Sequence, residues 1–309
     1  MSHPVSPILH HFEASPFSEK IRVVFGFKRM AWRSVLIPRI LPKPDLMPLT
    51  GGYRRTPVMQ IGADVYCDTQ IIVRAIEKHF PSPPLFPPQH FGSPAMIALW
   101  TDRAFFECTV RLVFGTLGDK VPQAFIEDRT KLRGAPFDVK AMTAGLPHHR
   151  DQFRAHAALL EAQLSHSNEY LLGYFTAADA HAYMNVWYVR SNLPELAERL
   201  LSDFPRVREW ETRVRTLGYG TRSDISGADA LAIARNTEPA TLPAHASLSA
   251  ESFKAGDRVT VGGDEPAPTP VEGELVALSS DHVAIRRTDP AVGFVTLHFP
   301  RLGFVVKET

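Results

Sequence analysis

The chain has 309 residues, of which 44% are hydrophobic and 22% are charged, and its formal net charge is +1. This length predicts two or three domains, since single hydrophobic cores stop growing near about 250–300 residues. The balanced charge excludes a strong field for nucleic acid or anionic lipid. No apolar run approaches the roughly 18 residues that span a bilayer, and residues 1–5 lack a signal pattern, so we expect a cytoplasmic protein.

The cysteines and histidines predict neither a disulfide framework nor a metal site. Cys67 and Cys108 are the only cysteines and do not form a CxxC pair, so both are expected to be reduced and buried. The histidine pairs at 10–11 and 148–149 are adjacent in sequence. Adjacent residues cannot both face one metal from a helix, so these histidines are interpreted as surface or packing residues.

Residues 6–80 alternate between strand and helix patterns. The expected strands are 8–12, 32–37, 58–61 and 64–67, and the expected helices begin at Pro16 and Thr69. The crossover through the first helix should make the first two strands parallel, whereas the tight turn at 61–64 should make the last two antiparallel. This order predicts a small mixed sheet.

A serine stands where the first strand passes into the first helix. Ser15 falls at the N-cap, and Pro16 takes the first helical position, where its missing N–H costs nothing. The unpaired N–H groups and the helix dipole favour an anion at this point, such as a carboxylate or a thiolate. Taken alone, Ser15 is interpreted as a plain helix cap rather than as a catalytic group.

Two further changes of pattern divide the rest of the chain. Five prolines between residues 81 and 88 predict an extended connector. The pattern from 93 to 234 is helical, without a convincing strand, and Thr176 and Asp179 have the spacing of a helix-capping box. Residues 236–249 are rich in Pro, Thr, Ala and Ser and are interpreted as a linker.

Five short strands with alternating polarity follow the linker. They are expected at 258–261, 273–278, 282–286, 292–298 and 304–306. Five strands in about 55 residues favour a small SH3-like barrel over an OB-like barrel. This region has no basic stripe or aromatic cluster typical of nucleic-acid binding, so we expect a structural or partner-binding accessory.

Four motifs, in their order and separation, resemble the cytosolic glutathione transferase family. They are SPFSEKIR at 15–22, TPV at 56–58, DT at 68–69 and TAAD at 176–179. The resemblance covers about residues 6–220 and implies an α/β thioredoxin-like domain followed by an all-α domain. The expected organisation is a glutathione-binding domain at 1–85, a helical domain at 93–234, a linker at 235–249 and a β-barrel at 250–309.

The first motif leaves the transferase class open. Omega-type enzymes have Cys-Pro-Phe where this chain has Ser15, Pro16 and Phe17. Zeta- and theta-type enzymes use a serine near this point instead. Without the omega-type cysteine, a mixed disulfide between glutathione and the enzyme is not expected.

The resemblance implies roles for the residues that match the motifs. Ser15 is the implied catalytic residue, since its hydroxyl would donate a hydrogen bond to the glutathione sulfur and favour the thiolate. The implied glutathione-binding residues are Phe17, Arg55, Thr56, Pro57, Asp68 and Thr69. Pro57 corresponds to the cis-proline of the family, and Thr56 would pair with the cysteinyl backbone. Thr69 would bind the γ-glutamyl carboxylate and Asp68 its ammonium group.

Two parts of the implied site are less specific. Residues 48–56 form a longer segment than the usual turn before the cis-proline, and either Arg54 or Arg55 could bind the glycyl carboxylate, with solvent exposure as the alternative. The pocket for the electrophile would be lined by the first helix of the helical domain. The candidates there are Trp100, Arg103, Phe106, Cys108 and Val110.

The function implied by the resemblance is that of a glutathione transferase, which activates glutathione as a co-substrate for attack on a small electrophile. A homodimer is expected, without a metal, nucleic-acid or membrane partner. Two alternatives stay open: a non-catalytic interaction scaffold, and a glutathione-dependent isomerase, lyase or reductase.

Overall fold

The computed structural model describes residues 6–164, 168–242, 253–266 and 269–309. Residues 1–5, on which the prediction about a signal pattern rested, lie outside this range. The predicted linker lies outside it from residue 243 onward.

The N-terminal region forms the predicted mixed sheet. Its elements are β1 (Ile8–His11), α1 (Pro16–Phe27), β2 (Ala31–Leu36), α2 (Met47–Thr50), β3 (Val58–Ile61), β4 (Asp64–Cys67) and α3 (Thr69–His79). β1 and β2 are parallel, and β3 and β4 are antiparallel, so both predicted pairings are confirmed. The short helix α2 was not predicted.

A helical bundle follows the proline-rich connector. It contains η1 (Pro88–His90), α4 (Ser93–Leu99), the π-helical turn η2 (Trp100–Phe105), α5 (Phe106–Leu117), η3 (Gly118–Lys120), α6 (Gln123–Arg133), α7 (Val139–Ala144), α8 (Leu146–Gln163), α9 (Ala177–Asn192), α10 (Pro194–Leu200) and α11 (Pro205–Thr216). The predicted capping box is confirmed, since the side chains of Thr176 and Asp179 each bond the other residue's backbone at the start of α9.

The prediction that no strand interrupts residues 93–234 is wrong. After α11 the chain returns to the N-terminal sheet and forms β5 (Thr221–Asp224), which pairs in parallel with β2. β5 is polar and mostly exposed, so it has no apolar alternation that a sequence pattern could detect. The helix α12 (Gly227–Arg235) follows and packs near α2, β2 and β9.

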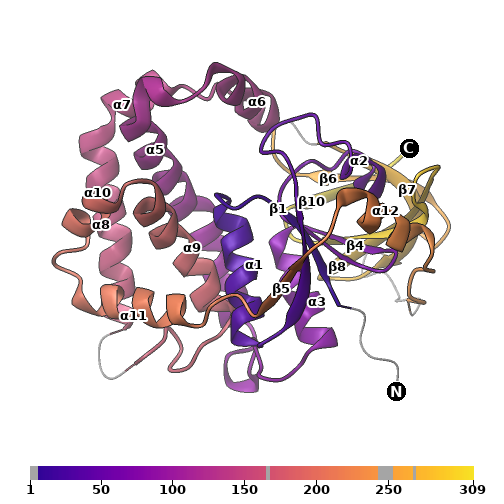
Figure 1. Cartoon of the computed structure of the whole chain (residues 1–309), viewed down its shortest axis with the longest axis horizontal. Helices are drawn as coiled ribbons and strands as arrows, with labels where there is room; N and C mark the ends of the chain where they lie inside the picture. Colours follow the sequence, from indigo (N-terminus) through magenta and orange to yellow (C-terminus); the bar gives the residue numbers. More distant parts are fainter. Residues whose placement is uncertain (1–5, 165–167, 243–252, 267–268) are drawn as a thin grey trace.

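The C-terminal region has the five predicted strands. They are β6 (Arg258–Gly263), β7 (Val271–Leu278), β8 (His282–Asp289), β9 (Gly293–Pro300) and β10 (Phe304–Glu308), hydrogen-bonded in the order β10-β6-β7-β8-β9. This small barrel is joined to the N-terminal sheet, because β9 also pairs in parallel with β4. Figure 1 shows the helical bundle on one side of the N-terminal elements and the barrel on the other.

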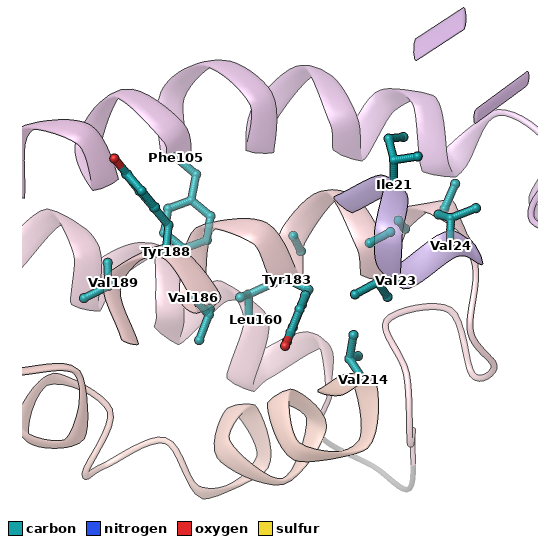
Figure 2. Packing of buried hydrophobic residues seen from close by; sticks show 14 of the residues in the cluster. Ile21, Val23, Val24, Phe105, Leu160, Tyr183, Val186, Tyr188, Val189 and Val214 are labelled. Carbon is teal, nitrogen blue, oxygen red and sulfur yellow. The ribbon is translucent and has the colours of Figure 1, made fainter. Parts of the chain in front are cut away.

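The two faces of the N-terminal sheet belong to different hydrophobic cores. Leu9 of β1 packs into the core shared with α1, α3 and the helical bundle, whereas its neighbour Ile8 packs into the core shared with α12 and the barrel. Figure 2 shows Ile21, Val23 and Val24 of α1 within the first of these cores. Because α1 contacts α9 closely, its N-terminus is held in a fixed position against the bundle.

Candidate functional site

One cavity of about 220 Å³ lies between the N-terminal region and the helical bundle. Its wall contains the predicted catalytic residue and all six predicted glutathione-binding residues: Ser15, Phe17, Arg55, Thr56, Pro57, Asp68 and Thr69. These residues come from the start of α1, the segment before β3 and the start of α3. The structure therefore brings three separate predicted motifs to one place.

Ser15 occupies the N-cap of α1, as predicted. Its Oγ accepts a hydrogen bond from the backbone N–H of Ser18 at 3.2 Å, and Pro16 follows at the first helical position. Within the described part of the chain, the hydroxyl proton of Ser15 has no acceptor. This proton is therefore available to a ligand atom that reaches the cavity beside the positive end of the helix.

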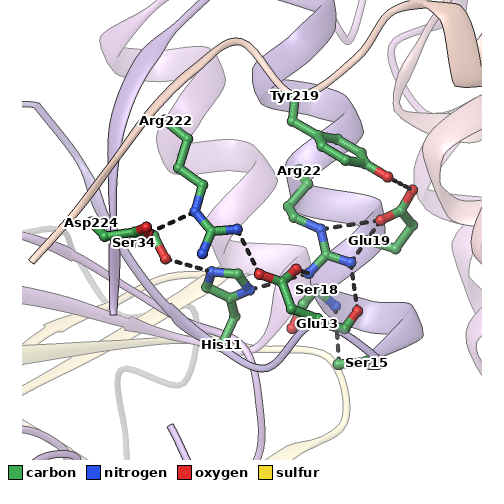
Figure 3. A network of polar contacts seen from close by, with 10 residues as sticks. All are labelled: His11, Glu13, Ser15, Ser18, Glu19, Arg22, Ser34, Tyr219, Arg222 and Asp224. Carbon is green, nitrogen blue, oxygen red and sulfur yellow. Dashed lines mark hydrogen bonds and ion pairs between the residues drawn. The ribbon is translucent and has the colours of Figure 1, made fainter. Parts of the chain in front are cut away.

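A buried polar network holds this end of α1 in place. Arg22 donates to Glu19 Oε2 at 2.7 Å and to the carbonyl oxygen of Glu13 at 2.8 Å, and its guanidinium also contacts His11 Nδ1. Tyr219, from the segment before β5, donates to the other oxygen of Glu19 at 2.9 Å. Figure 3 shows these groups together with Ser15, which lies at the edge of the network. Polar residues of the first motif thus fix the helix rather than face solvent.

A second buried ion pair joins α1 to the helical bundle and to α3. The ammonium of Lys20, which is 0% exposed, donates to both oxygens of Asp102 at 2.7 and 2.8 Å and to Thr69 Oγ1 at 3.0 Å. Burial by itself raises the pKa of Asp102, but Lys20 and His181 outweigh it and hold this pKa below its ordinary value. Because Thr69 accepts from Lys20, its own hydroxyl proton can point to a ligand.

The start of α3 provides an anion-binding end next to a carboxylate. Asp68 is the N-cap, with a positive φ of 93° and its Oδ1 accepting from the backbone N–H of Gln70 at 2.8 Å. Burial raises the pKa of Asp68, and the positive charges of Lys20 and Arg55 partly oppose this increase. The site therefore places hydrogen-bond donors and an acidic group side by side.

The peptide bond between Thr56 and Pro57 is cis, as the resemblance implied. Thr56 lies two residues before β3, and among the described residues no hydrogen bond uses its backbone N–H or C=O. The side-chain oxygen of Thr56 accepts from Lys43 Nζ at 2.8 Å. An extended ligand backbone can therefore pair with Thr56 without displacing a protein hydrogen bond.

Lys43 is a cation of the cavity that the sequence did not identify. Its side chain is only 4% exposed, and its ammonium binds the carbonyl oxygen of Arg54 at 2.9 Å in addition to Thr56. No acidic partner binds it within the described residues. Burial lowers the pKa of Lys43 to about 8, and the positive charges of Arg129 and Arg54 contribute to the decrease.

The two arginines proposed for a carboxylate have different surroundings. Arg54 is buried in an ion pair with Asp128 of α6. Arg55 is 37% exposed and pairs with Glu265, which follows β6 in the C-terminal barrel. Arg54 is therefore not a solvent-exposed residue, which was one of the two expectations for it. The ion pair between Arg55 and Glu265 was not predicted from the sequence.

Only two of the five residues expected for the electrophile pocket line the cavity. They are Phe106 and Val110. Trp100 instead donates to His156 Nδ1, Arg103 lies near Asp264, and Cys108 donates to the carbonyl oxygen of His149. The π-helical turn η2 lies directly before α5, and a π-helical turn departs from the regular helical spacing on which the sequence prediction relied.

The remaining wall comes from residues far apart in the sequence. Apolar and aromatic residues of α5, α6, α9 and the loop after α6 line it: Phe114, Phe125, Leu132, Phe137 and Tyr188. Basic residues complete it: Arg39, Arg129 and Arg133. Nothing in the local sequence of these residues separates cavity lining from ordinary packing.

Across the described ranges, no group of three or more His, Cys, Asp or Glu side chains has an arrangement that could hold a metal ion. Both cysteines are buried and free. None of the described helices is long and apolar enough to cross a bilayer.

Comparison with known families finds two matching domain models. Residues 9–84 match the glutathione S-transferase N-terminal domain, and residues 141–213 match the glutathione S-transferase C-terminal domain. No curated protein matches the sequence.

Solved structures show the same likeness. A GST-like protein from Pseudomonas syringae is 38% identical, with a TM-score of 0.83, and the match covers 99% of this chain and 100% of that protein. FzlA from C. crescentus is 23% identical, with a TM-score of 0.52, over 69% of this chain and 88% of its own. A glutathione S-transferase from Rhodospirillum rubrum is 19% identical, with a TM-score of 0.51, over 68% of this chain and 88% of its own. The last two likenesses concern the fold alone.

Proposed function

Because this chain belongs to the glutathione S-transferase family, we propose that its cavity binds glutathione and ionises the thiol for attack on a small electrophile. The observation that supports this proposal is the convergence of the Ser15 hydroxyl, the backbone of Thr56 and the start of α3 on one cavity. A homodimeric assembly, which the resemblance implied, belongs to the same proposal. So does a cytoplasmic location, which we expect from the lack of a membrane-spanning run and of a signal pattern in the sequence.

In the proposed complex, the tripeptide lies across these three groups. The cysteinyl backbone pairs with Thr56, and the γ-glutamyl carboxylate takes the hydroxyl of Thr69 and the N–H groups at the start of α3. Asp68 accepts from the γ-glutamyl ammonium. Arg55 lines the same cavity as Asp68 and Thr69, and the proposed complex assigns its guanidinium to this end as well.

Lys43 is a better partner for the glycyl carboxylate than Arg54. The guanidinium of Arg54 already binds Asp128, whereas Lys43 is a buried cation bound only to neutral oxygens. It lies beside Thr56, on which the cysteinyl residue would pair. A carboxylate there would form a charge-assisted hydrogen bond with an ammonium that has no other acidic partner in the described structure.

The chemistry then rests on the thiol. Ser15 donates its hydroxyl proton to the sulfur, the N-terminus of α1 adds its dipole, and the thiol proton passes to solvent. The thiolate attacks the electrophilic carbon, so that a sulfur–carbon bond forms and the leaving group departs with its electron pair or the electrons enter an acceptor double bond. Ser15 stabilises the nucleophile and forms no covalent bond.

Calorimetric titration with glutathione, together with ultraviolet absorbance of the bound thiolate, tests the proposal. We expect glutathione to bind with release of a proton and with a thiolate signal. S-methylglutathione, which has no thiol, should bind without proton release and without that signal. No binding at about millimolar glutathione would refute the proposal. Binding without thiolate formation would favour the non-catalytic scaffold.

Replacing Lys43 should weaken glutathione binding in a pH-dependent way. Its cationic form exists below a pKa of about 8, so its contribution to affinity is present at neutral pH and is lost as the pH rises through that value. Loss of one charge-assisted hydrogen bond corresponds to about a 10-fold increase in Kd. We therefore expect Lys43→Met to bind S-methylglutathione about 10-fold more weakly than the native chain near neutral pH.

Measuring the Kd of S-methylglutathione across pH shows whether the ammonium of Lys43 binds the ligand. The native chain should approach the affinity of Lys43→Met as the pH rises, whereas Lys43→Arg should keep its affinity, because a guanidinium stays charged. S-methylglutathione serves as the ligand since it has no thiol that titrates in the same range. A native chain and a Lys43→Met variant with parallel pH profiles would contradict the assignment.

A further inference from the structure

One part of the cavity wall combines aromatic rings with cations. The rings of Phe114, Phe125 and Phe137 pack on one another with centroids 5.0 to 6.1 Å apart. The guanidinium of Arg129 lies over the ring of Phe125 at 4.6 Å, and that of Arg39 lies over the same ring at 5.1 Å. A planar apolar group would be surrounded by rings and guanidinium planes here.

The cavity carries much more positive than negative charge. Six basic residues line it, namely Arg39, Lys43, Arg54, Arg55, Arg129 and Arg133, against one acidic residue, Asp68. Arg133 pairs with Glu107 at 2.7 Å, and Arg55 pairs with Glu265. Among the described residues, the other four cations form ion pairs with only one carboxylate, that of Asp128. It pairs with Arg54 and Arg129, and neither Arg39 nor Lys43 has an acidic partner there.

Together with burial, the positive charges of these basic residues lower the pKa of one of their own members, Arg129. Burial lowers the pKa of Arg129, and the charges of Arg54 and Arg39 lower it further. Such like-charge crowding in a partly enclosed cavity favours the binding of anions. Glutathione supplies one carboxylate for Lys43 in the proposed complex, which leaves Arg39 and Arg129 with positive charge that glutathione does not neutralise.

We propose that the second substrate is an aromatic electrophile that carries a carboxylate or a comparable anionic group. Its ring lies against Phe125 and its neighbours, and its anion binds Arg39 and Arg129. This inference rests on the proposed binding of glutathione in the same cavity. Arg39 is therefore a specificity-determining residue.

Two glutathione conjugates that differ in one charge test this inference without requiring turnover. They are S-(para-carboxybenzyl)glutathione and S-(para-carbamoylbenzyl)glutathione, which have the same ring and similar size. We expect calorimetry on the native chain to show about 10-fold tighter binding of the carboxylate, the usual size of a charge-assisted hydrogen bond. Arg39→Gln or Arg129→Gln should reduce this preference at least about 3-fold and leave the carbamoyl conjugate nearly unaffected.

Arg103→Gln is the matched control, because Arg103 comes from the neighbouring turn η2 but does not line the cavity. It should leave the preference unchanged. Equal binding of the two conjugates by the native chain would overturn the inference while glutathione binding itself stands. Failure of both conjugates and of glutathione to bind would instead refute the proposed function.

The C-terminal barrel contacts Arg55, a residue that lines the same cavity. Glu265 pairs with Arg55. The pKa of Tyr53 is raised mainly by burial, then by Asp68 and Cys67, and to a smaller extent by the negative charge of Glu265. Its neighbour Asp264 lies 3.7 Å from Arg103 of the helical bundle. The segment after β6 therefore contacts both the glutathione-binding domain and the bundle.

The contact with Glu265 leaves most of Arg55 free for a ligand. Only Nη2 of Arg55 donates to Glu265, and a guanidinium has five N–H donors in a planar fork. Arg55 is 37% exposed and Glu265 is 26% exposed, so the pair adds little to stability. Its effect is to restrict a long side chain that otherwise has many rotamers.

We infer that Glu265 is a positioning residue for glutathione, since it holds Arg55 ready for the γ-glutamyl carboxylate. This inference also depends on the proposed binding of glutathione. Gly263 offers a way to test it without changing charge, because a Cβ at this position would lie 1.8 Å from Oε2 of Glu265. Gly263→Ala should push the carboxylate away from Arg55.

Glu265→Gln and Gly263→Ala should each raise the Kd of S-methylglutathione about 3- to 10-fold, the usual effect of losing a preorganised side chain, with the unfolding midpoint nearly unchanged. In an Arg55→Gln background, Glu265→Gln should have no further effect. Asp264→Asn is the control and should leave the Kd unaltered. Tighter binding in Glu265→Gln, or effects that simply add in the double variant, would overturn the inference, whereas a native chain that binds neither glutathione nor S-methylglutathione would refute the proposed function.

Discussion

Ser15→Ala is expected to lower kcat/KM near neutral pH about 10- to 100-fold, because a hydrogen bond to a charged sulfur contributes about 1.5–3 kcal/mol. The same energy corresponds to an increase of about one to two units in the pKa of bound thiol. The activity of the variant should therefore recover at high pH. A pH profile of kcat/KM with the native chain and the variant measures both effects.

Ser18→Ala is the matched control for this experiment. Ser18 lies one turn along α1, does not line the cavity, and its Oγ has no hydrogen-bond partner in the described part of the chain. Its removal should leave the thiol pKa unaltered. Ser15→Thr should retain much of the activity, since it keeps a hydroxyl at the N-cap. Equal thiol pKa values in the native chain and Ser15→Ala would show that the helix terminus alone activates glutathione.

Asp102→Asn should have the largest effect on stability, a loss of about 3–5 kcal/mol, since it leaves the Lys20 ammonium buried without a negative partner. Urea unfolding at neutral pH measures this loss. The low pKa of Asp102 fixes the sign of the pH dependence. Stability from its charge is present above the ordinary carboxyl pKa of about 4 and disappears as the pH falls through the lower pKa of the folded state.

A double variant separates stability from binding. Lys20→Met with Asp102→Leu replaces the ion pair by apolar side chains and should recover most of the lost stability. It should not recover affinity for S-methylglutathione, because Thr69 then lacks the Lys20 N–H that orients its hydroxyl. If affinity returned together with stability, Lys20 would have no role in orienting Thr69.

The sequence was informative where structure is specified locally. The Ser15 cap follows from a serine before a proline and an amphipathic run, and the parallel and antiparallel pairings follow from the crossover and the tight turn. Family motifs added what local rules could not provide, since Thr56, Pro57 and Asp68 are ordinary turn and cap residues by themselves. Their roles in binding remain predictions.

Long-range contacts explain what the sequence did not show. Lys20 and Arg22 occupy positions on a helix where charged residues are usually solvated, and their burial depends on partners such as Asp102, which lies 82 residues from Lys20. Lys43 likewise depends on the fold of the segment before Thr56. Strand β5 forms only because it pairs with β2, and its own residues favour no strand.

The pairing of β9 with β4 has a consequence for how this chain avoids aggregation. The outer strands of the continuous sheet are β5 and β10, and both are short and carry charged residues such as Arg222 and Lys307. The fully buried strand β4 would form an outer edge if the barrel were absent. An apolar edge with free N–H and C=O groups is a template for intermolecular strand addition. By pairing with β4, the barrel removes this edge from the surface of the sheet.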